Sequence, residues 1–152
     1  MKALSLWQPY ASLIGLGAKT IETRSWATNY RGPLMILGAK KWDAEIADEC
    51  HRCVNVLRAN CFQIPSDRNW RVGLLTWEQT RGCILACCEL LDCRAMRWPP
   101  RDKPLDAEFG TFGPGRFGWV LGNVVPVLPP IPYTGRQGLF DIPATILKGH
   151  LP

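Results

Sequence analysis

The sequence of 152 residues lacks the features that define several large protein classes. Its apolar runs all fall well short of the roughly 20 residues that a membrane-spanning helix requires, so we expect no contact with a membrane. The apolar stretch at its start is too short for a secretory signal peptide and is interrupted at Gln8 and Pro9. No internal repeat, heptad pattern or low-complexity tract is present. We therefore expect one domain over residues 1–152, located in the cytoplasm.

Residues that ligate metals are few and poorly spaced. The chain has two histidines, His51 and His150, and one C-x-x-C pair, Cys50 and Cys53. A structural zinc site needs four ligands, and no second C-x-x-C pair exists to complete the set. Seven cysteines without an export signal are typical of reduced thiols in a cytosolic protein. We predict no metal and no cofactor.

Basic residues, by contrast, are concentrated at one end of the chain. Residues 1–41 hold six lysines and arginines and one acid, Glu22, whereas the other 111 residues hold twelve charges of each sign. The net charge of +5 therefore comes entirely from this first segment. A local excess of positive charge attracts anions more strongly than the same charge spread evenly. The segment is a candidate site for a phosphate-bearing or otherwise anionic ligand.

Local patterns predict several strands and two helices. Pro9 favours a helix over 9–16 that ends at Gly17, and Asp43 can cap a second helix over 44–58. In the second helix one apolar stripe covers a core; it consists of Ile46, Cys50, Cys53 and Leu57. Strands are expected over 3–6, 20–24, 34–37, 82–93, 117–125 and 139–142.

The remaining segments are predicted to be irregular. Prolines and glycines make 97–115 a long loop, and four prolines after residue 125 force an extended path outside the sheet. Residues 60–81 are polar, with Trp70 and Trp77 as aromatic anchors. Five or six strands with two flanking helices predict an α+β domain built on a small β-barrel.

Several motifs in this chain resemble the ASCH family. They are Leu-Ser-Leu-Trp-Gln-Pro-Tyr-Ala at 4–11, Gly-Ala-Lys-Thr-Ile-Glu-Thr-Arg at 17–24, and Tyr-Arg-Gly-Pro-Leu at 30–34. The second matches every fixed position of the family signature Gly-x-Lys-x-x-Glu-x-Arg. Pro-Ile-Pro at 130–132, Gly-Arg-Gln-Gly at 135–138 and Phe140 are similar to stand-alone bacterial members, so the resemblance spans nearly the whole chain.

The resemblance implies a fold and a class of ligand. The family is similar to PUA-type RNA-binding domains, which are small mixed β-barrels with a cleft beside the signature residues. It therefore implies RNA, other single-stranded nucleic acid or a modified nucleoside as the partner. One branch hydrolyses N4-acetylcytidine with a threonine nucleophile where this chain has Glu22, which argues against that mechanism here. The same resemblance also leaves a ribonuclease and a protein-interaction module open.

The charged signature residues suit a nucleic-acid ligand. On a strand, Glu22 and Arg24 lie on one face, and Lys19 in the preceding turn can reach the same space. Arg24 presents a planar fork to a phosphate or base edge, and Glu22 can accept from an exocyclic amine. Lys19 supplies a point charge or, with Glu22, the catalytic groups of an enzyme. The alternative is that Glu22 and Arg24 form an exposed ion pair of little energetic value.

Neighbouring aromatic and polar residues extend this candidate site. Trp26 and Tyr30 are placed to stack on bases, while Trp7 is expected in the core. Gln8 either presents its amide to a base or caps the first helix. The loop 97–115 either closes over a nucleotide or is simply solvated. The predicted ligand contacts are Gln8, Lys19, Glu22, Arg24, Trp26, Tyr30, Arg31 and Arg136.

Overall fold

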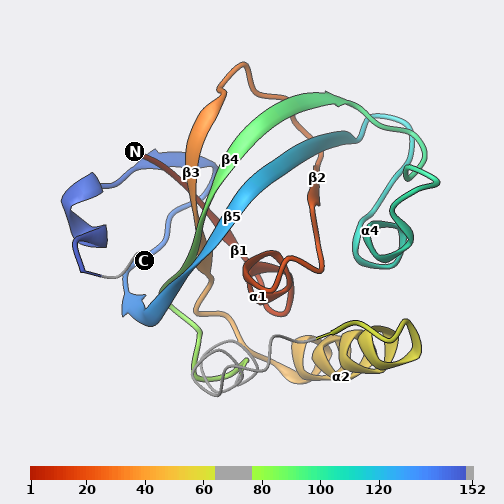
Figure 1. Cartoon of the computed structure of the whole chain (residues 1–152), viewed down its shortest axis with the longest axis horizontal. Helices are drawn as coiled ribbons and strands as arrows, with labels where there is room; N and C mark the ends of the chain where they lie inside the picture. Colours follow the sequence, from red (N-terminus) through yellow and green to blue (C-terminus); the bar gives the residue numbers. More distant parts are fainter. Residues whose placement is uncertain (64–76, 150–152) are drawn as a thin grey trace.

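A curled six-stranded sheet is the frame of the computed structural model, which describes residues 1–63 and 77–149 (Figure 1). The strand order is β2-β5-β4-β3-β1-β6. Within this sheet β1 and β3 pair in parallel, and the other neighbours are antiparallel. The strands are β1 (Lys2–Leu6), β2 (Ile21–Arg24), β3 (Gly32–Gly38), β4 (Cys83–Ala95), β5 (Phe117–Pro132) and β6 (Leu139–Asp141). The curled sheet confirms the predicted α+β, barrel-like class and agrees with a PUA-like fold.

The central strand β3 is apolar throughout because it is buried on both faces. Leu34 and Ile36 point into the larger core, which also contains the fully buried Trp119. Met35 and Leu37 alternate with them and join a second core on the opposite face. This second core also contains residues of β6 and of the short 3-10 helix η1 (Ala144–Leu147). A strand covered on both faces has no polar face, so its sequence does not alternate.

Two of the helices follow their sequence signals closely. α1 (Tyr10–Gly15) lies inside the curl of the sheet and ends before Gly17, whose φ of 74° only glycine adopts without strain. α2 (Ala44–Ala59) begins after Asp43, whose side chain accepts a hydrogen bond from the Ile46 N–H at 2.9 Å. Its predicted stripe of Ile46, Cys50, Cys53 and Leu57 is buried.

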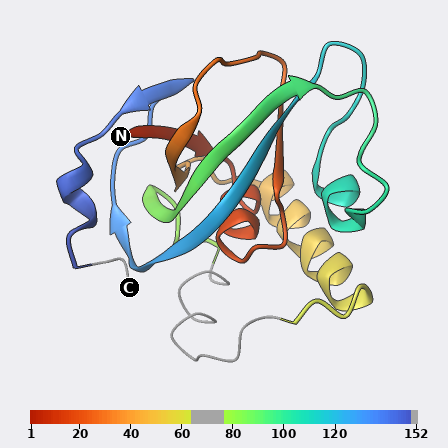
Figure 2. The same ribbon diagram turned by 45° about the horizontal axis from the view of Figure 1, so that its top comes forward.

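The prediction that 97–115 is entirely a loop is wrong, because this segment contains α4 (Pro104–Phe109). Proline breaks the interior of a helix, but Pro104 stands in the first turn, where its missing N–H costs nothing. Both ribbon views place α4 beside β2, on the side of the sheet opposite β6 (Figures 1 and 2). The segment is thus fixed against the strand that carries the signature.

The prolines after residue 125 do not end the sheet either. β5 continues to Pro132, with Pro126 opposite Ala86 and Pro132 opposite Cys83. The register shifts between Ile84 and Ala86, so the intervening residues of β5 bulge out of the ladder. Prolines lack the N–H that a ladder needs, and a bulge accommodates them without breaking the strand.

Among the described residues, no helix is long and apolar enough to cross a membrane. Most of the segment 60–81, predicted to be irregular, lies outside the described residues; this part includes Trp70. His150 also lies outside them.

Candidate nucleic-acid interface

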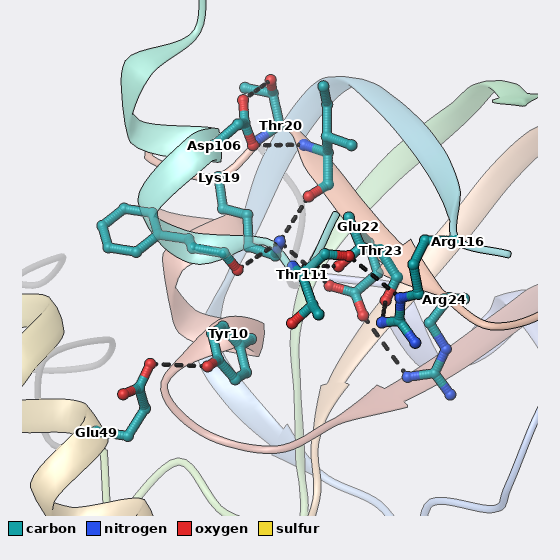
Figure 3. A network of polar contacts seen from close by, with 12 residues as sticks. Tyr10, Lys19, Thr20, Glu22, Thr23, Arg24, Glu49, Asp106, Thr111 and Arg116 are labelled. Carbon is teal, nitrogen blue, oxygen red and sulfur yellow. Dashed lines mark hydrogen bonds and ion pairs between the residues drawn. The ribbon is translucent and has the colours of Figure 1, made fainter. Parts of the chain in front are cut away.

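Lys19, the signature lysine, is buried to the point that only 1% of its surface is exposed. Its Nζ donates hydrogen bonds to the carbonyl of Ile21 at 2.6 Å and to that of Phe109 at 3.0 Å. It also lies 3.5 Å from the Glu22 Oε2 and over the ring of Tyr10 at 5.8 Å from its centroid (Figure 3). A buried ammonium must be paired in this way, because its desolvation is costly. Lys19 therefore joins β2 to the end of α4.

Asp106 makes the second connection between the same two elements. Its carboxylate is 2% exposed and accepts from the N–H groups of Thr20 and Ile21, both at 2.8 Å, and from the Thr20 hydroxyl at 2.6 Å. Lys103 donates to the same hydroxyl at 2.8 Å. We refer to Lys19, Thr20, Asp106 and the Phe109 carbonyl as the β2–α4 contact. It fixes α4 and the residues that follow it along one side of β2.

Glu22 and Arg24 have a different environment from Lys19. The Arg24 Nη1 lies 3.6 Å from the Glu22 Oε1, and its guanidinium lies over the Trp26 ring at 5.8 Å. Glu22 is 7% exposed, so the pair is not the exposed ion pair considered from the sequence. The Nε of Arg24 is buried without a hydrogen-bond partner in the described part of the chain. Such unpaired donors are rare in folded proteins, and a bound acceptor would satisfy it.

A pocket of about 800 Å³ opens beside these two residues. It is lined by parts of β1, β2 and the segments after β3, α4 and β5. Four cations border it, Arg24, Lys40, Arg116 and Arg136, against one carboxylate, Glu22. Its other lining residues are Ser5, Leu6, Trp7, Tyr10, Thr23, Trp26, Ala39, Phe109, Thr111, Thr134, Gly135, Gln137 and Gly138. We refer to this site as the basic pocket.

Aromatic rings border the basic pocket together with these cations. Trp26 packs edge-to-face on Trp119 at 4.6 Å between centroids, and Trp119 donates to the Trp26 carbonyl at 3.3 Å. The expectation that Trp7 lies in the core is wrong: it is 53% exposed, with the Lys41 ammonium 4.1 Å from its ring centroid. Trp7 follows the last residue of β1, so it projects beyond the sheet instead of into it.

Tyr10 connects the basic pocket to α2. Its hydroxyl donates to the Glu49 Oε1 at 2.7 Å, and Arg52 holds both oxygens of Glu49 at 2.7 and 2.8 Å. The Arg52 hydrogen bonds lower the pKa of Glu49, whereas burial and the bond to Glu49 raise the pKa of Tyr10. Arg52 also donates to the Glu108 carbonyl of α4 at 3.0 Å. The network therefore joins α1, α2 and α4 behind the pocket.

Four predicted contacts lie outside the pocket lining: Lys19, which belongs to the β2–α4 contact, and Gln8, Tyr30 and Arg31. Gln8 is buried, donates to the Thr80 hydroxyl at 2.6 Å and accepts from the Ser12 N–H at 3.2 Å, so its amide serves the first helix. The Tyr30 hydroxyl donates to the carbonyl of Pro33. Arg31 pairs with Asp92 at 3.1 Å and donates to three backbone carbonyls. Each of these side chains has a structural partner instead of facing the pocket.

The structure also separates the cations of residues 1–41. Lys2 pairs with Asp141 and Lys41 with Asp43, as Arg31 does with Asp92. Other cations line the pocket instead: Arg116 lies directly before β5, and Arg136 lies in the segment before β6. Arg116 is held by hydrogen bonds to the carbonyls of Thr23 and Thr111. Of these two, the sequence analysis selected Arg136 as a contact but not Arg116.

The glycine at 135 allows the last segment to approach β1 closely. A Cβ added there would meet the Ser5 Oγ at 2.1 Å, so any larger residue would displace one wall of the pocket. Ser5 itself has a buried hydroxyl without a hydrogen-bond partner in the described residues. The close approach that Gly135 allows is therefore to β1, and it sets the position of Arg136 beside the pocket.

The cysteines lie apart from this chemistry. Burial raises the pKa of Cys50, Cys53 and Cys88 to about 12, which keeps their thiols protonated and unreactive. No group of three metal-ligating side chains gathers anywhere in residues 1–63 and 77–149.

Comparison with known proteins identifies the family of this chain. The model of the ASCH domain matches residues 4–109, which include the whole signature. The chain belongs to the ASCH domain family. It is 27% identical over 147 residues to activating signal cointegrator 1 of Homo sapiens, and 26% identical to that of Mus musculus. These matches cover 96% of this chain but 23% of either relative. The assignment to a bacterial type of ASCH protein stays a prediction.

Proposed function

We propose that this ASCH domain binds single-stranded RNA, or a modified nucleoside within it, in the basic pocket. One observation carries the proposal: four cations and the rings of Trp7 and Trp26 border one pocket beside the signature. Cations neutralise phosphates, and aromatic rings stack on bases of any sequence. A volume of about 800 Å³ also lies in the range of pockets that hold small ligands.

Glu22 supplies the group that can recognise a base. Its carboxylate is almost buried and lies between Lys19 and Arg24, at 3.5 and 3.6 Å. A carboxylate accepts hydrogen bonds from an exocyclic amine such as cytosine N4. In this arrangement Arg24 and Arg116 meet the phosphates, Trp7 or Trp26 stacks on the base, and Glu22 contacts its edge.

The test is the salt dependence of RNA binding, measured by fluorescence anisotropy with a short cytidine-rich single-stranded RNA. For the wild type, log K should fall with log salt by about 0.7 for each phosphate neutralised. Arg24→Ala should weaken binding roughly 10- to 100-fold, as expected for removal of a charge-assisted hydrogen bond. It should also flatten the salt slope.

Arg58→Ala is the matched control. Arg58 is exposed in the last turn of α2 and is absent from the pocket lining, so this variant loses the same charge elsewhere. Its affinity should stay close to that of the wild type. No binding at low salt, or equal losses in both variants, would contradict the proposal.

A further inference from the structure

A second group of basic and aromatic residues lies outside the basic pocket, in the segment 94–103 between β4 and α4. Its ten residues include Arg94, Arg97, Arg101 and Lys103 against one acid, Asp102. Residues 42–152 have no net charge as a whole, because acidic residues elsewhere balance the local excess of positive charge in this segment. We refer to the segment as the Trp98 loop.

Trp98 is the most exposed large apolar side chain among the described residues, with 73% of its surface accessible. The Arg97 guanidinium lies over its ring at 5.7 Å. Pro99 and Pro100 follow and restrict the backbone. Binding a ligand to the Trp98 ring therefore costs little conformational entropy. An exposed tryptophan beside arginines is the combination that stacks on a base while neutralising its phosphates.

Two residues of the Trp98 loop, Met96 and Lys103, are fixed to segments that adjoin the basic pocket. Met96 donates its N–H to the carbonyl of Arg116 at 2.9 Å, and Arg116 lines the pocket. At the end of the loop, Lys103 donates to the Thr20 hydroxyl, directly before β2. Figures 1 and 2 both show the loop on the same side of the molecule as β2 and α4. A strand of RNA leaving the pocket past Arg116 therefore meets this loop.

We propose that the Trp98 loop is a second binding site for single-stranded RNA, in which a base outside the basic pocket stacks on Trp98. Arg97 and Arg101 meet the neighbouring phosphates, whereas Arg94 is paired with Asp92 at 3.7 Å. The inference rests on the proposed function, because it extends the path of the same RNA. The positive charge of the loop and its continuity with the pocket favour RNA over a protein partner.

The experiment compares RNA probes of two lengths, about 3 and about 12 nucleotides, of the same composition. The shorter occupies the pocket alone, and the longer reaches the loop. Trp98→Ala should weaken binding of the longer probe by roughly 5- to 100-fold, the effect of losing one stacked base. Binding of the shorter probe should be unchanged, and Trp98→Phe should retain most of the affinity.

A second readout separates stacking from charge. Trp98→Ala should leave the salt slope of the longer probe intact, because the substitution removes no charge. The double variant Arg97→Gln, Arg101→Gln should reduce that slope by about 0.7 for each phosphate that is no longer neutralised. Because all three side chains are exposed, urea unfolding should show the stability of the wild type for every variant.

The outcomes distinguish the two proposals. If the affinity of the longer probe depends on Arg24 but not on Trp98, the second binding site is overturned and the basic pocket is retained. The same result is expected if the Trp98 loop binds a protein instead of RNA. Affinity that depends on Trp98 but not on Arg24 would overturn the basic pocket. Equal losses for both probes in Trp98→Ala would overturn the second binding site, because the short probe does not reach the loop.

Discussion

Lys19 and Arg24 belong to the same eight-residue signature, yet they occupy opposite kinds of environment. Lys19 is fully buried and its ammonium bonds two backbone carbonyls and approaches Glu22. Arg24 borders the basic pocket, with one ion pair at 3.6 Å and an Nε that has no partner among the described residues. The signature therefore has a structural half, the β2–α4 contact, and a half that faces the basic pocket. Glu22 lies between them and belongs to both.

The largest expected effect tests the structural half. Lys19→Met should lower the free energy of unfolding by about 3–5 kcal/mol, because it leaves the buried Glu22 and two carbonyls without the ammonium. Arg24→Met, which removes a partly exposed cation from the same signature, should cost about 1 kcal/mol or less. Urea denaturation measures both. Similar losses in the two variants would show that the signature is not divided in this way.

A smaller effect is expected where Tyr10 connects the pocket to α2. Glu49→Gln should destabilise the protein by about 1 kcal/mol at pH 7, since it weakens charge-assisted bonds to Arg52 and Tyr10. The lowered pKa of Glu49 means that its contribution is present above the unfolded pKa and is lost as pH falls through the folded value.

The difference between wild type and Glu49→Gln should therefore vanish in acid. Urea titrations at about pH 7 and about pH 3 measure it, on either side of the unfolded glutamate pKa. A difference that is the same at both pH values would mean that the ionised carboxylate is not what joins α1 to α2.

The smallest expected effect concerns catalysis. We predict no useful turnover of N4-acetylcytidine, because a carboxylate is a poor substitute for a hydroxyl nucleophile on an amide carbonyl. Thr20 does not line the basic pocket, and the Thr23 hydroxyl accepts a hydrogen bond from the Thr111 N–H at 2.9 Å, so neither hydroxyl replaces the missing nucleophile there. Chromatography of wild type, Lys19→Ala and Glu22→Gln measures the conversion to cytidine. Turnover that both substitutions abolish would make Lys19 and Glu22 catalytic.

Much of the fold could be predicted because local chemistry decided it. Asp43 caps α2, Gly17 ends α1, and the apolar stripe of α2 faces the core. Proline is the residue that local patterns misjudge most often. Pro104 begins a helix and Pro126 lies within a strand, because the missing N–H matters only where a partner needs it. That need depends on neighbours that the local sequence does not reveal.

The candidate site was predicted less completely. Of the predicted contacts, Glu22, Arg24, Trp26 and Arg136 line the pocket, and their role in binding stays a prediction, whereas Trp7 was assigned to the core and Lys40 was not selected. For Trp7, the signal for exposure was its position directly after the strand. A side chain beyond the last paired residue is not held in the sheet. For Lys40, no local pattern distinguished it from Lys41.

The sequence by itself determined the family, the α+β class and the strand that carries the signature, because each follows from residues close together in the chain. Only the tertiary structure decided which cations line the basic pocket. Lys2, Arg31 and Lys41 found carboxylates, Lys19 was buried by α4, and Arg116 and Arg136 arrived from distant segments. Charges interact through space and over a few ångströms, so their distribution along the chain does not fix the field in the pocket.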